Sequence, residues 1–430
     1  MKSIILIDPP TPCNTNVQNI GLGYIGASLK QLGHKVSVVD MARNPRADVA
    51  TLEGADFIGL SVKTHNYAEA QKLTAHLRQG ETKIVWGGAH VTLLAESLIE
   101  ENPDVDFFVV GEGEYFTLNL DGASKMCYTG YVDDLDSLPF PDYKMFDSYS
   151  LILEQGRWPL ITTRGCPYGC TFCAVGLISG RKVRWRSVEN CMKEVEYAIG
   201  QGFRQIQILD DNFSFYLDRA KQFCKEIKKF HIPWNCPNGL RCDRFDEELA
   251  SLMVDAGCYQ VSFGVETAHP DVYKGIGKGE TLEDIEAAVE TAKKHGLQVN
   301  CYFIIGLPGS TFERDLESLK WAIRHKVKAD FNMLVPYPQT RIWNWVQDKL
   351  IMKEVWSGTH FGKMAYPTFE TPEYPAEDMM DAFLIFNYVC GSGFTKEWYQ
   401  SQGLSHVIEI DLMARAKRHL EPLKEAGVLK

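Results

Sequence analysis

The sequence lacks any hydrophobic run long enough to cross a membrane. Its longest candidate, residues 382–390, is roughly half of the ~20 apolar residues that a spanning helix needs. The apolar run at residues 4–7 ends at Asp8 and is too short for the hydrophobic part of a signal peptide. We therefore expect no membrane span, and a cytoplasmic location.

The chain also lacks the excess of positive charge that a general nucleic-acid binder needs. Its 56 acidic residues outnumber its 45 lysines and arginines, so the net charge is -11, and we expect no nucleic-acid partner. The twelve cysteines follow no disulfide framework, which favours a reducing compartment. One small basic cluster is interpreted as a solvated face, or as a contact for an acidic substrate or reductase; it consists of Arg181, Lys182, Arg184 and Arg186.

Three cysteines do stand at a defined spacing, C-x-x-x-C-x-x-C, at Cys166, Cys170 and Cys173. Four-iron clusters normally take four cysteine thiolates, so three would leave one iron open to a non-protein ligand. The alternatives are a structural zinc loop or cysteines packed as small hydrophobic residues. A closed zinc site needs four tetrahedral ligands, and no fourth Cys or His stands nearby. The loop follows an apolar run at 158–162, where a barrel enzyme carries its chemistry.

The order of apolar runs predicts an α/β fold with two parallel blocks. The first block is a doubly wound, Rossmann-like sheet, with strands at 3–7, 35–39, 56–62, 83–86 and 106–110 and helices near 21–33, 66–80 and 90–101. The second block has six βα units and therefore forms a partial (β/α)6 barrel; its strands lie near 158–163, 204–209, 233–237, 259–264, 298–305 and 330–335, and its helices near 187–200, 216–229, 245–256, 281–295 and 312–325.

These blocks give the expected domain boundaries for a chain of 430 residues, which should hold two or three domains. The Rossmann-like domain covers 1–125, and an Asp- and Pro-rich linker covers 126–155. The partial barrel covers 156–336. A small C-terminal region, 337–430, is expected to close the mouth of the barrel.

The cysteine loop and the barrel together resemble the radical S-adenosylmethionine (SAM) superfamily over roughly residues 155–340. In that family the amino and carboxylate groups of SAM chelate the fourth iron of a 4Fe-4S cluster. The reduced cluster cleaves SAM to a 5'-deoxyadenosyl radical, which abstracts hydrogen from the substrate. The resemblance implies sensitivity to oxygen and an electron donor such as flavodoxin or ferredoxin.

Further positions resemble the SAM-binding places of this family. Phe172 corresponds to the aromatic residue whose backbone meets the adenine. Asp210, Asp211 and Asn212 end the second barrel strand where the family usually carries Gly-Gly-Glu, with a helix cap as the alternative interpretation. Glu266 ends the fourth strand and is expected to accept from the ribose. The fifth strand ends in a loop that lets backbone approach the adenine, because its glycines carry no side chain; the residues are Gly306 and Leu307.

The first block resembles the cobalamin-binding domain of the cobalamin-dependent (class B) radical SAM enzymes. Doubly wound sheets bind ligands at the carboxyl ends of their strands. In the family the Ser and Gly-Gly positions line the dimethylbenzimidazole tail. The Asp-x-His-x-x-Gly signature is missing, so the lower face of cobalamin should carry water, another side chain or nothing. The expected contacts are Ser61, Gly87, Gly88, His90, Gly111, Glu112 and Gly113, with His90 as a contact or helix-start residue rather than a cobalt ligand.

The segment from Gly21 to Gly26 matches the dinucleotide fingerprint G-x-G-x-x-G letter for letter. It begins about fourteen residues after the first strand, and residues 20–32 have the pattern of a helix. We therefore interpret these glycines as helix packing on the sheet, with an NAD site as the alternative.

The resemblance implies a radical SAM enzyme that methylates an unactivated carbon, with one SAM methylating cobalamin and a second giving the radical. The first alternative is a radical SAM dehydratase, epimerase or cyclase acting on a small molecule, with no cobalamin in the first domain. The second is a non-catalytic iron-sulfur or cobalamin sensor. The substrate is expected to be a small molecule or a lipid. Candidate substrate contacts are Tyr337 and Arg341 and, with buried packing as their alternative, Cys236 and Cys301.

Overall fold

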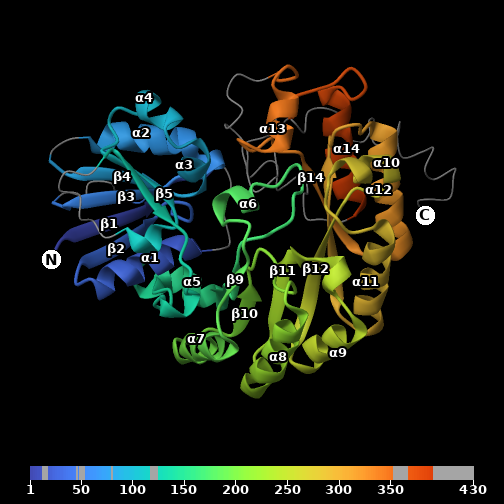
Figure 1. Cartoon of the computed structure of the whole chain (residues 1–430), viewed down its shortest axis with the longest axis horizontal. Helices are drawn as coiled ribbons and strands as arrows, with labels where there is room; N and C mark the ends of the chain where they lie inside the picture. The colour runs from blue at the N-terminus through green and yellow to red at the C-terminus, as the bar shows by residue number, and fades with distance from the viewer. Residues whose placement is uncertain are drawn as a thin grey trace. The chain divides into compact units, whose positions relative to one another are not determined.

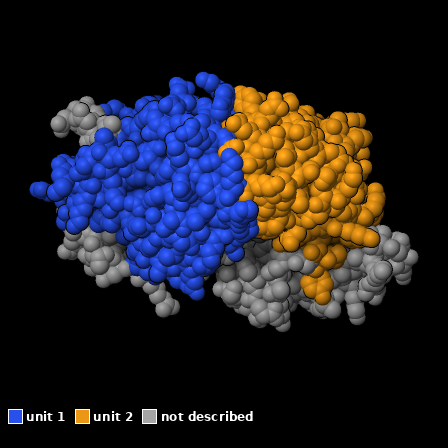
Figure 2. All heavy atoms as spheres, turned by 90° about the horizontal axis from the view of Figure 1, so that it is seen from below, with its two compact units in different colours: residues 1–167, 174–211, 229–233 blue, residues 168–173, 212–228, 234–430 orange. Residues whose placement is uncertain are grey.

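The computed structural model describes residues 1–11, 18–44, 47, 54–78, 81–116, 124–351 and 367–390. The chain divides into two compact units (Figures 1 and 2). Unit 1 consists of residues 1–167, 174–211 and 229–233, and unit 2 of residues 168–173, 212–228 and 234–430. The boundary crosses the cysteine loop, residues 165–173, so Cys166 belongs to unit 1 and the other two cysteines to unit 2. Much of the expected C-terminal region, including 391–430, lies outside the described residues.

Unit 1 begins with a six-stranded parallel sheet in the order β2-β1-β3-β4-β5-β6. The strand order reverses direction at β1, which creates the switch point where doubly wound sheets bind ligands. Helices pack beside this sheet (Figure 1). The elements are β1 (Ser3–Asp8), α1 (Ile20–Gln31), β2 (Lys35–Asp40), β3 (Phe57–Ser61), α2 (Tyr67–Leu77), β4 (Lys83–Gly87), α3 (Ala89–Leu94), α4 (Ser97–Glu101), β5 (Phe107–Gly111) and β6 (Met126–Gly130).

The Rossmann-like prediction is confirmed, and the structure adds β6, which the sequence pattern missed. This strand pairs in parallel with β5, although its residues are only half-buried or exposed. A short edge strand with one solvent-exposed face carries no continuous apolar run. Its sequence therefore shows no hydrophobic periodicity that would predict a strand.

Helix α1 contains the G-x-G-x-x-G segment, as the packing interpretation expected. A side-chain carbon on Gly23 would lie 2.9 Å from Pro141 and 3.0 Å from the Tyr143 ring. One on Gly26 would lie 2.5 Å from the sulfur of Met145. These glycines therefore let residues 141–145 approach the helix closely.

The rest of unit 1 contains the first strands of the second block. Strands β7 and β10 pair in parallel, and β8 and β9 form a short antiparallel pair. Trp158 is buried between Tyr143 and Phe203, with both ring centroids 4.9 Å away. The elements are α5 (Tyr149–Gln155), β7 (Arg157–Leu160), β8 (Thr163–Arg164), α6 (Val175–Ile178), β9 (Arg184–Trp185), α7 (Val188–Gly200) and β10 (Gln205–Ile208).

Unit 2 carries the other four barrel strands, which are parallel and lie in the order β14-β13-β12-β11. The elements are α8 (Leu217–Ile227), β11 (Trp234–Leu240), α9 (Glu247–Asp255), β12 (Cys258–Glu266), α10 (Pro270–Gly275), α11 (Leu282–Lys294), β13 (Gln298–Ile305), α12 (Phe312–His325), β14 (Lys328–Met333), α13 (Arg341–Val346) and α14 (Ala376–Val389). All six predicted βα strands are thus present in the chain.

Helix α14 covers the outer edge of β14. The Asn387 side chain accepts from the Phe331 amide at 3.0 Å and donates to the Phe331 carbonyl at 2.9 Å. It therefore pairs with the backbone as a neighbouring strand would, which satisfies the polar groups of this edge. No helix in the described part of the chain is long and apolar enough to cross a membrane.

Candidate functional site

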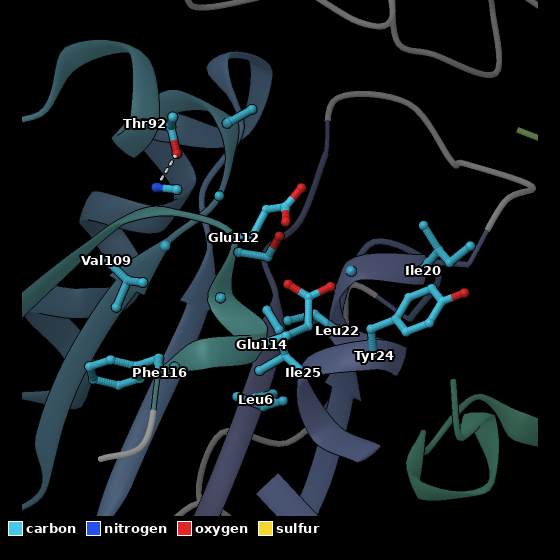
Figure 3. Close-up of a pocket in the computed structure, with 18 of the residues that line it drawn as sticks. Leu6, Ile20, Leu22, Tyr24, Ile25, Thr92, Val109, Glu112, Glu114 and Phe116 are labelled. Carbon is cyan, nitrogen blue, oxygen red and sulfur yellow. Dashed lines mark hydrogen bonds between the residues drawn. The ribbon is translucent and has the colours of Figure 1, made fainter. Parts of the chain in front are cut away.

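Unit 1 contains a cavity of about 450 Å³ at the carboxyl ends of the strands of its first sheet. Apolar side chains form most of its wall, among them Leu6, Leu22, Ile25 and Val109 (Figure 3). Six of the seven positions predicted to contact cobalamin line this cavity, namely Ser61, Gly87, Gly88, Gly111, Glu112 and Gly113.

Two glycines at the rim of the cavity occupy backbone conformations that side chains rarely adopt. Gly88 has φ 104°, and a Cβ there would lie 2.7 Å from the Val62 carbonyl oxygen. Gly111 has φ 103°, and a Cβ there would lie 2.7 Å from the Gly130 carbonyl oxygen. The Gly111 amide also donates to Thr92 Oγ1 at 3.2 Å (Figure 3). The sequence therefore needs glycine at both strand ends, and backbone forms the rim.

His90, the seventh predicted contact, lies outside the lining of this cavity. It is fully buried, with Nδ1 3.2 Å from Thr64 Oγ1 and its ring 4.6 Å from that of Tyr67. Burial lowers the pKa of His90 to about 4, so the ring is neutral near pH 7. Helix α3 begins at the preceding residue, in agreement with its interpretation as a helix-start residue.

An ion-pair network stands at the polar end of the cavity. Glu112 accepts from both terminal nitrogens of Arg184, at 2.7 and 2.8 Å. Arg164 donates to Glu114 at 2.6 Å and lies 3.4 Å from Glu112. Burial raises the pKa of Glu112, but the hydrogen bonds from Arg184 and the charge of Arg164 hold it below its usual range. Figure 3 shows the Glu112 and Glu114 carboxylates together at the rim, with Tyr24 beside them. Sequence reasoning missed Glu114 and Arg164.

The interpretation of the basic cluster is wrong for two of its four members. Arg184 and Arg186 are only 4% and 3% exposed. Arg186 donates to Glu194 at 2.5 Å, and Glu194 also accepts from Trp158 Nε1 at 2.8 Å. Both arginines therefore neutralise buried carboxylates inside unit 1 and present no solvated basic face.

The first part of the cysteine loop is held by two aspartates. Asp210 accepts from the Thr162 amide at 2.5 Å and from the Thr162 and Thr163 hydroxyls at 2.5 and 3.0 Å. Asp211 accepts from the Gly165 amide at 2.8 Å. The helix-cap alternative does not hold, since α8 begins after Tyr216 and has no side-chain cap. These carboxylates brace the backbone that leads into Cys166.

The second part of the loop packs inside unit 2. The Thr171 amide donates to the Ile276 carbonyl at 2.9 Å, and the Thr171 carbonyl accepts from the Ile342 amide at 3.2 Å. Phe172 is half-buried. The guanidinium of Arg241 lies 3.5 Å from the centroid of the Tyr168 ring. The two backbone hydrogen bonds of Thr171 and the Arg241 guanidinium stacked on Tyr168 together fix the shape of the loop.

The three cysteines of the loop fit a 4Fe-4S cluster in which one iron has no protein ligand. The three loop thiols are partly exposed, whereas six other described cysteines are buried. Among the described residues, no three His, Cys, Asp or Glu side chains gather as they would around a single ion. A four-iron cluster distributes its thiolates over separate irons and needs no such gathering.

The other predicted SAM contacts in unit 2 are fixed by an ion pair, by backbone hydrogen bonds or by burial. Glu266 ends β12 with φ 65° and lies 3.1 Å from Lys278 Nζ. The Gly306 amide donates to Asp315 at 3.2 Å, and the Ser310 hydroxyl donates to the same carboxyl group. Burial raises the pKa of Asp315 to about 7. Leu307 is buried and Asn212 is 1% exposed.

The candidate substrate contacts fall into two groups. Tyr337 and Arg341 lie near the cysteine loop within unit 2, and a Cβ on Gly169 would be 3.4 Å from Arg341 Nη2. Burial, with Cys173 nearby, raises the pKa of Tyr337 to about 12. Cys236 and Cys301 are 2% and 0% exposed, which favours their packing alternative.

Two family descriptions match the chain. The B12 binding domain matches residues 13–120, and the radical SAM superfamily matches residues 160–322. Together these matches imply cobalamin, SAM and a 4Fe-4S cluster as cofactors.

Several curated proteins are similar over most of their length. An uncharacterised methyltransferase of Pyrococcus horikoshii is 29% identical, over 83% of this chain and 86% of its own. The cytidylyl-2-hydroxyethylphosphonate methyltransferase of Streptomyces wedmorensis is 28% identical, over 67% and 69%. The bacteriochlorophyllide d C-12(1)-methyltransferase of Chlorobaculum tepidum is 24% identical, over 86% and 82%.

Two solved structures share the fold. The radical SAM methyltransferase TsrM from Kitasatospora setae, with cobalamin and a [4Fe-4S] cluster bound, has a TM-score of 0.69 at 15% identity and covers 97% of this chain and 100% of its own. The cobalamin-dependent radical enzyme OxsB has a TM-score of 0.59 at 19% identity, over 87% and 59%. The chain therefore carries a B12 binding domain followed by a radical SAM domain.

Proposed function

We propose that this protein is a cobalamin-dependent methyltransferase that methylates an unactivated carbon of a small molecule. One observation carries the proposal. The cavity at the strand ends of the B12 domain is also lined by Thr163, Arg164 and Asp211, which lie directly before the cysteine loop or hold it. The proposed cobalamin site therefore adjoins the start of the loop whose cysteines would hold the 4Fe-4S cluster.

The residues present fit the cofactors that these domains imply. The apolar wall and glycine rim of the cavity suit a flat apolar group such as the cobalamin tail, since Gly87 and Gly88 add no side chain there. Cys166, Cys170 and Cys173 would hold the cluster. When bound, the cluster supplies the electron that cleaves SAM, and cobalamin supplies the methyl group.

The chain's own residues orient these groups and limit what reaches them. Glu266 and the Gly306–Leu307 backbone would contact SAM at two strand ends. The buried Glu112–Arg184 and Glu114–Arg164 pairs fix the polar end of the cavity, where an arginine neutralises each glutamate. Exclusion of water from such a site protects a radical from quenching.

The substrate end of the site includes Arg341. Its side chain is exposed and lies next to Gly169 of the cysteine loop. A guanidinium binds carboxylate and phosphate groups through paired hydrogen bonds, so a substrate with an anionic group would suit this position. The relatives' substrates, a nucleotide-linked phosphonate among them, are consistent with a small molecule.

The proposal is tested on protein purified without oxygen and reconstituted with iron, sulfide and hydroxocobalamin. We expect about four iron per chain, one corrinoid, and, with reductant, SAM and a methyl acceptor, equimolar S-adenosylhomocysteine and 5'-deoxyadenosine. Methyl-labelled SAM and a panel of small anionic acceptors then identify the methylated product.

The control is Cys170→Ala, which should bind corrinoid normally and produce no deoxyadenosine. Deoxyadenosine without S-adenosylhomocysteine would contradict methyl transfer and point to the dehydratase, epimerase or cyclase alternative. Absence of both products in protein loaded with cluster and corrinoid would leave only the sensor alternative.

A further inference from the structure

A buried group of charges lies in unit 2, and two of its members, Lys278 and Glu280, have no role in the site described so far. It consists of Glu266, Lys278, Glu280 and Arg241, and is called here the Lys278 cluster. Lys278 Nζ lies 2.9 Å from Glu280 and 3.1 Å from Glu266, and it also donates to the Gly264 carbonyl. The Lys278 and Glu280 side chains are 8% and 0% exposed. A lysine enclosed in this way is uncommon unless its charge is paired.

The charges of this cluster are mutually dependent. Burial acts to lower the pKa of Lys278, but the Glu266 and Glu280 carboxylates outweigh it and hold the pKa above its usual range. The lysine is therefore cationic, and it fixes Glu266 by a charge-assisted hydrogen bond and Glu280 by an ion pair. Its removal would take the shared cation away from both buried carboxylates, and Arg241 would remain 3.6 Å from Glu280.

The Lys278 cluster holds Glu266 in an unusual place. Glu266 has φ 65°, a conformation that non-glycine residues keep only where their surroundings impose it, and the pairing of β12 with β13 shifts register between Gly264 and Glu266. A Cβ on Gly264 would lie 3.0 Å from Lys278 Nζ and would strike the Glu266 carboxylate. The Gly-Val-Glu sequence thus makes room for the ion pair at the end of β12.

The other end of the cluster reaches the cysteine loop. Arg241 stacks on the Tyr168 ring, donates to the Lys278 carbonyl at 2.7 Å and lies 3.6 Å from Glu280. Tyr168 stands between Cys166 and Cys170 in the sequence. A continuous chain of contacts within unit 2 therefore joins the cysteine loop to the carboxylate at the end of β12.

We propose that Lys278 is a positioning residue for SAM, which holds the Glu266 carboxylate at a fixed place relative to the cysteine loop. The inference rests on the proposed function, because it takes Glu266 as a contact of SAM. Lys278 acts through Glu266 and touches no reacting atom. We therefore expect Lys278 to affect the affinity for SAM, and to leave the binding of the 4Fe-4S cluster and of cobalamin unchanged.

The test compares Lys278→Gln with Lys274→Gln, which removes an exposed lysine from neighbouring helix α10. Both proteins are reconstituted, and the Kd for SAM is measured from the change in the EPR spectrum of the reduced cluster. We expect Lys278→Gln to weaken SAM binding about tenfold or more, as for the loss of one charge-assisted hydrogen bond. Iron content and the Kd for cobalamin should match those of wild type, and Lys274→Gln should bind SAM normally.

A second variant keeps the inference testable if Lys278→Gln does not fold. Glu280→Gln preserves the side-chain volume and can still accept from the Cys242 amide, which lies 3.0 Å away. It should weaken SAM binding in the same selective way. A folded variant of either kind that binds SAM as tightly as wild type would overturn the inference. Failure of the wild type to bind SAM would instead reject the proposed function.

Discussion

The substitution Gly88→Ala tests whether bare backbone is needed at the rim of the cobalamin cavity. Gly88 combines φ 104° with ψ -176°, a region essentially restricted to glycine. The added Cβ would lie 2.7 Å from the Val62 carbonyl oxygen and 3.1 Å from the Val62 nitrogen. Val62 cannot move easily, because its carbonyl accepts from the His90 amide at 3.1 Å and its amide donates to the Gly87 carbonyl at 2.7 Å.

The cost of this substitution follows from two effects. The backbone conformation costs an alanine about 1–3 kcal/mol, and the close approach to a fixed peptide costs roughly 1–3 kcal/mol more. A total near 3 kcal/mol would lower the melting temperature of a domain of this size by roughly 6–12 °C. Relief of the strain by movement of the strand ends would deform the cavity, so we expect cobalamin affinity to fall more than tenfold.

The assay is a spectroscopic titration with hydroxocobalamin alongside thermal unfolding of the same protein. Gly87→Ala is the matched control, since a Cβ there would meet Val109 at an ordinary 3.7 Å and no positive φ is involved. It should keep the melting temperature of wild type and weaken cobalamin only modestly. A Gly88→Ala protein that binds cobalamin as wild type does would refute the argument that the rim must be bare backbone.

Three further predictions address other parts of the site. Cys170→Ala should retain its fold but lose the visible absorption and most of the iron of the cluster, measured by iron analysis after reconstitution. Because His90 is fully buried beside Thr64 and lies outside the lining of the cavity, the EPR spectrum of the cobalt(II) form should show no nitrogen splitting from His90, and His90→Gln should leave it unchanged. The pKa of Asp315 is about 7 when folded, well above the ordinary ~3.9. The folded protein therefore retains a proton that the unfolded chain releases, so stability should fall as pH rises from about 4 to about 7 and then level off. Asp315→Asn should flatten this melting-temperature profile; an unchanged slope would contradict the assignment.

The first five strands of the first sheet, the six barrel strands and the main helices between them were predictable because their apolar periods are strong. The first sheet and the six barrel strands appear within a few residues of their expected positions, since parallel strands are buried on both faces and are rich in Val and Ile. The cysteine spacing was equally informative. The glycines at 87, 88 and 111 were also expected at strand ends, and the structure supplies the reason for two of them in their positive φ angles.

Buried charge was not predictable, because its partners are distant in the sequence. Arg184 pairs with Glu112, which is 72 residues away, and Arg164 pairs with Glu114, which is 50 residues away. A window of sequence around Arg184 shows only neighbouring cations and indicates a solvated face. Only the fold brings the carboxylate to it, and a buried charge without such a partner would be strongly unfavourable.

Asp210 and Asp211 depart from the Gly-Gly-Glu sequence that the family usually carries at this strand end. The hydrogen bonds that the two aspartates accept explain this departure. Their place at the end of the second barrel strand makes them candidate contacts of SAM. In the structure, both oxygens of Asp210 accept from Thr162 and Thr163, and Asp211 accepts from the Gly165 amide. Gly165 has φ 92°, and a Cβ there would lie 2.5 Å from the Lys182 carbonyl oxygen, so the entry to the cysteine loop is a tight turn. The two aspartates thus supply acceptors for backbone that this turn leaves without strand partners, and their first role is to hold the loop that carries Cys166.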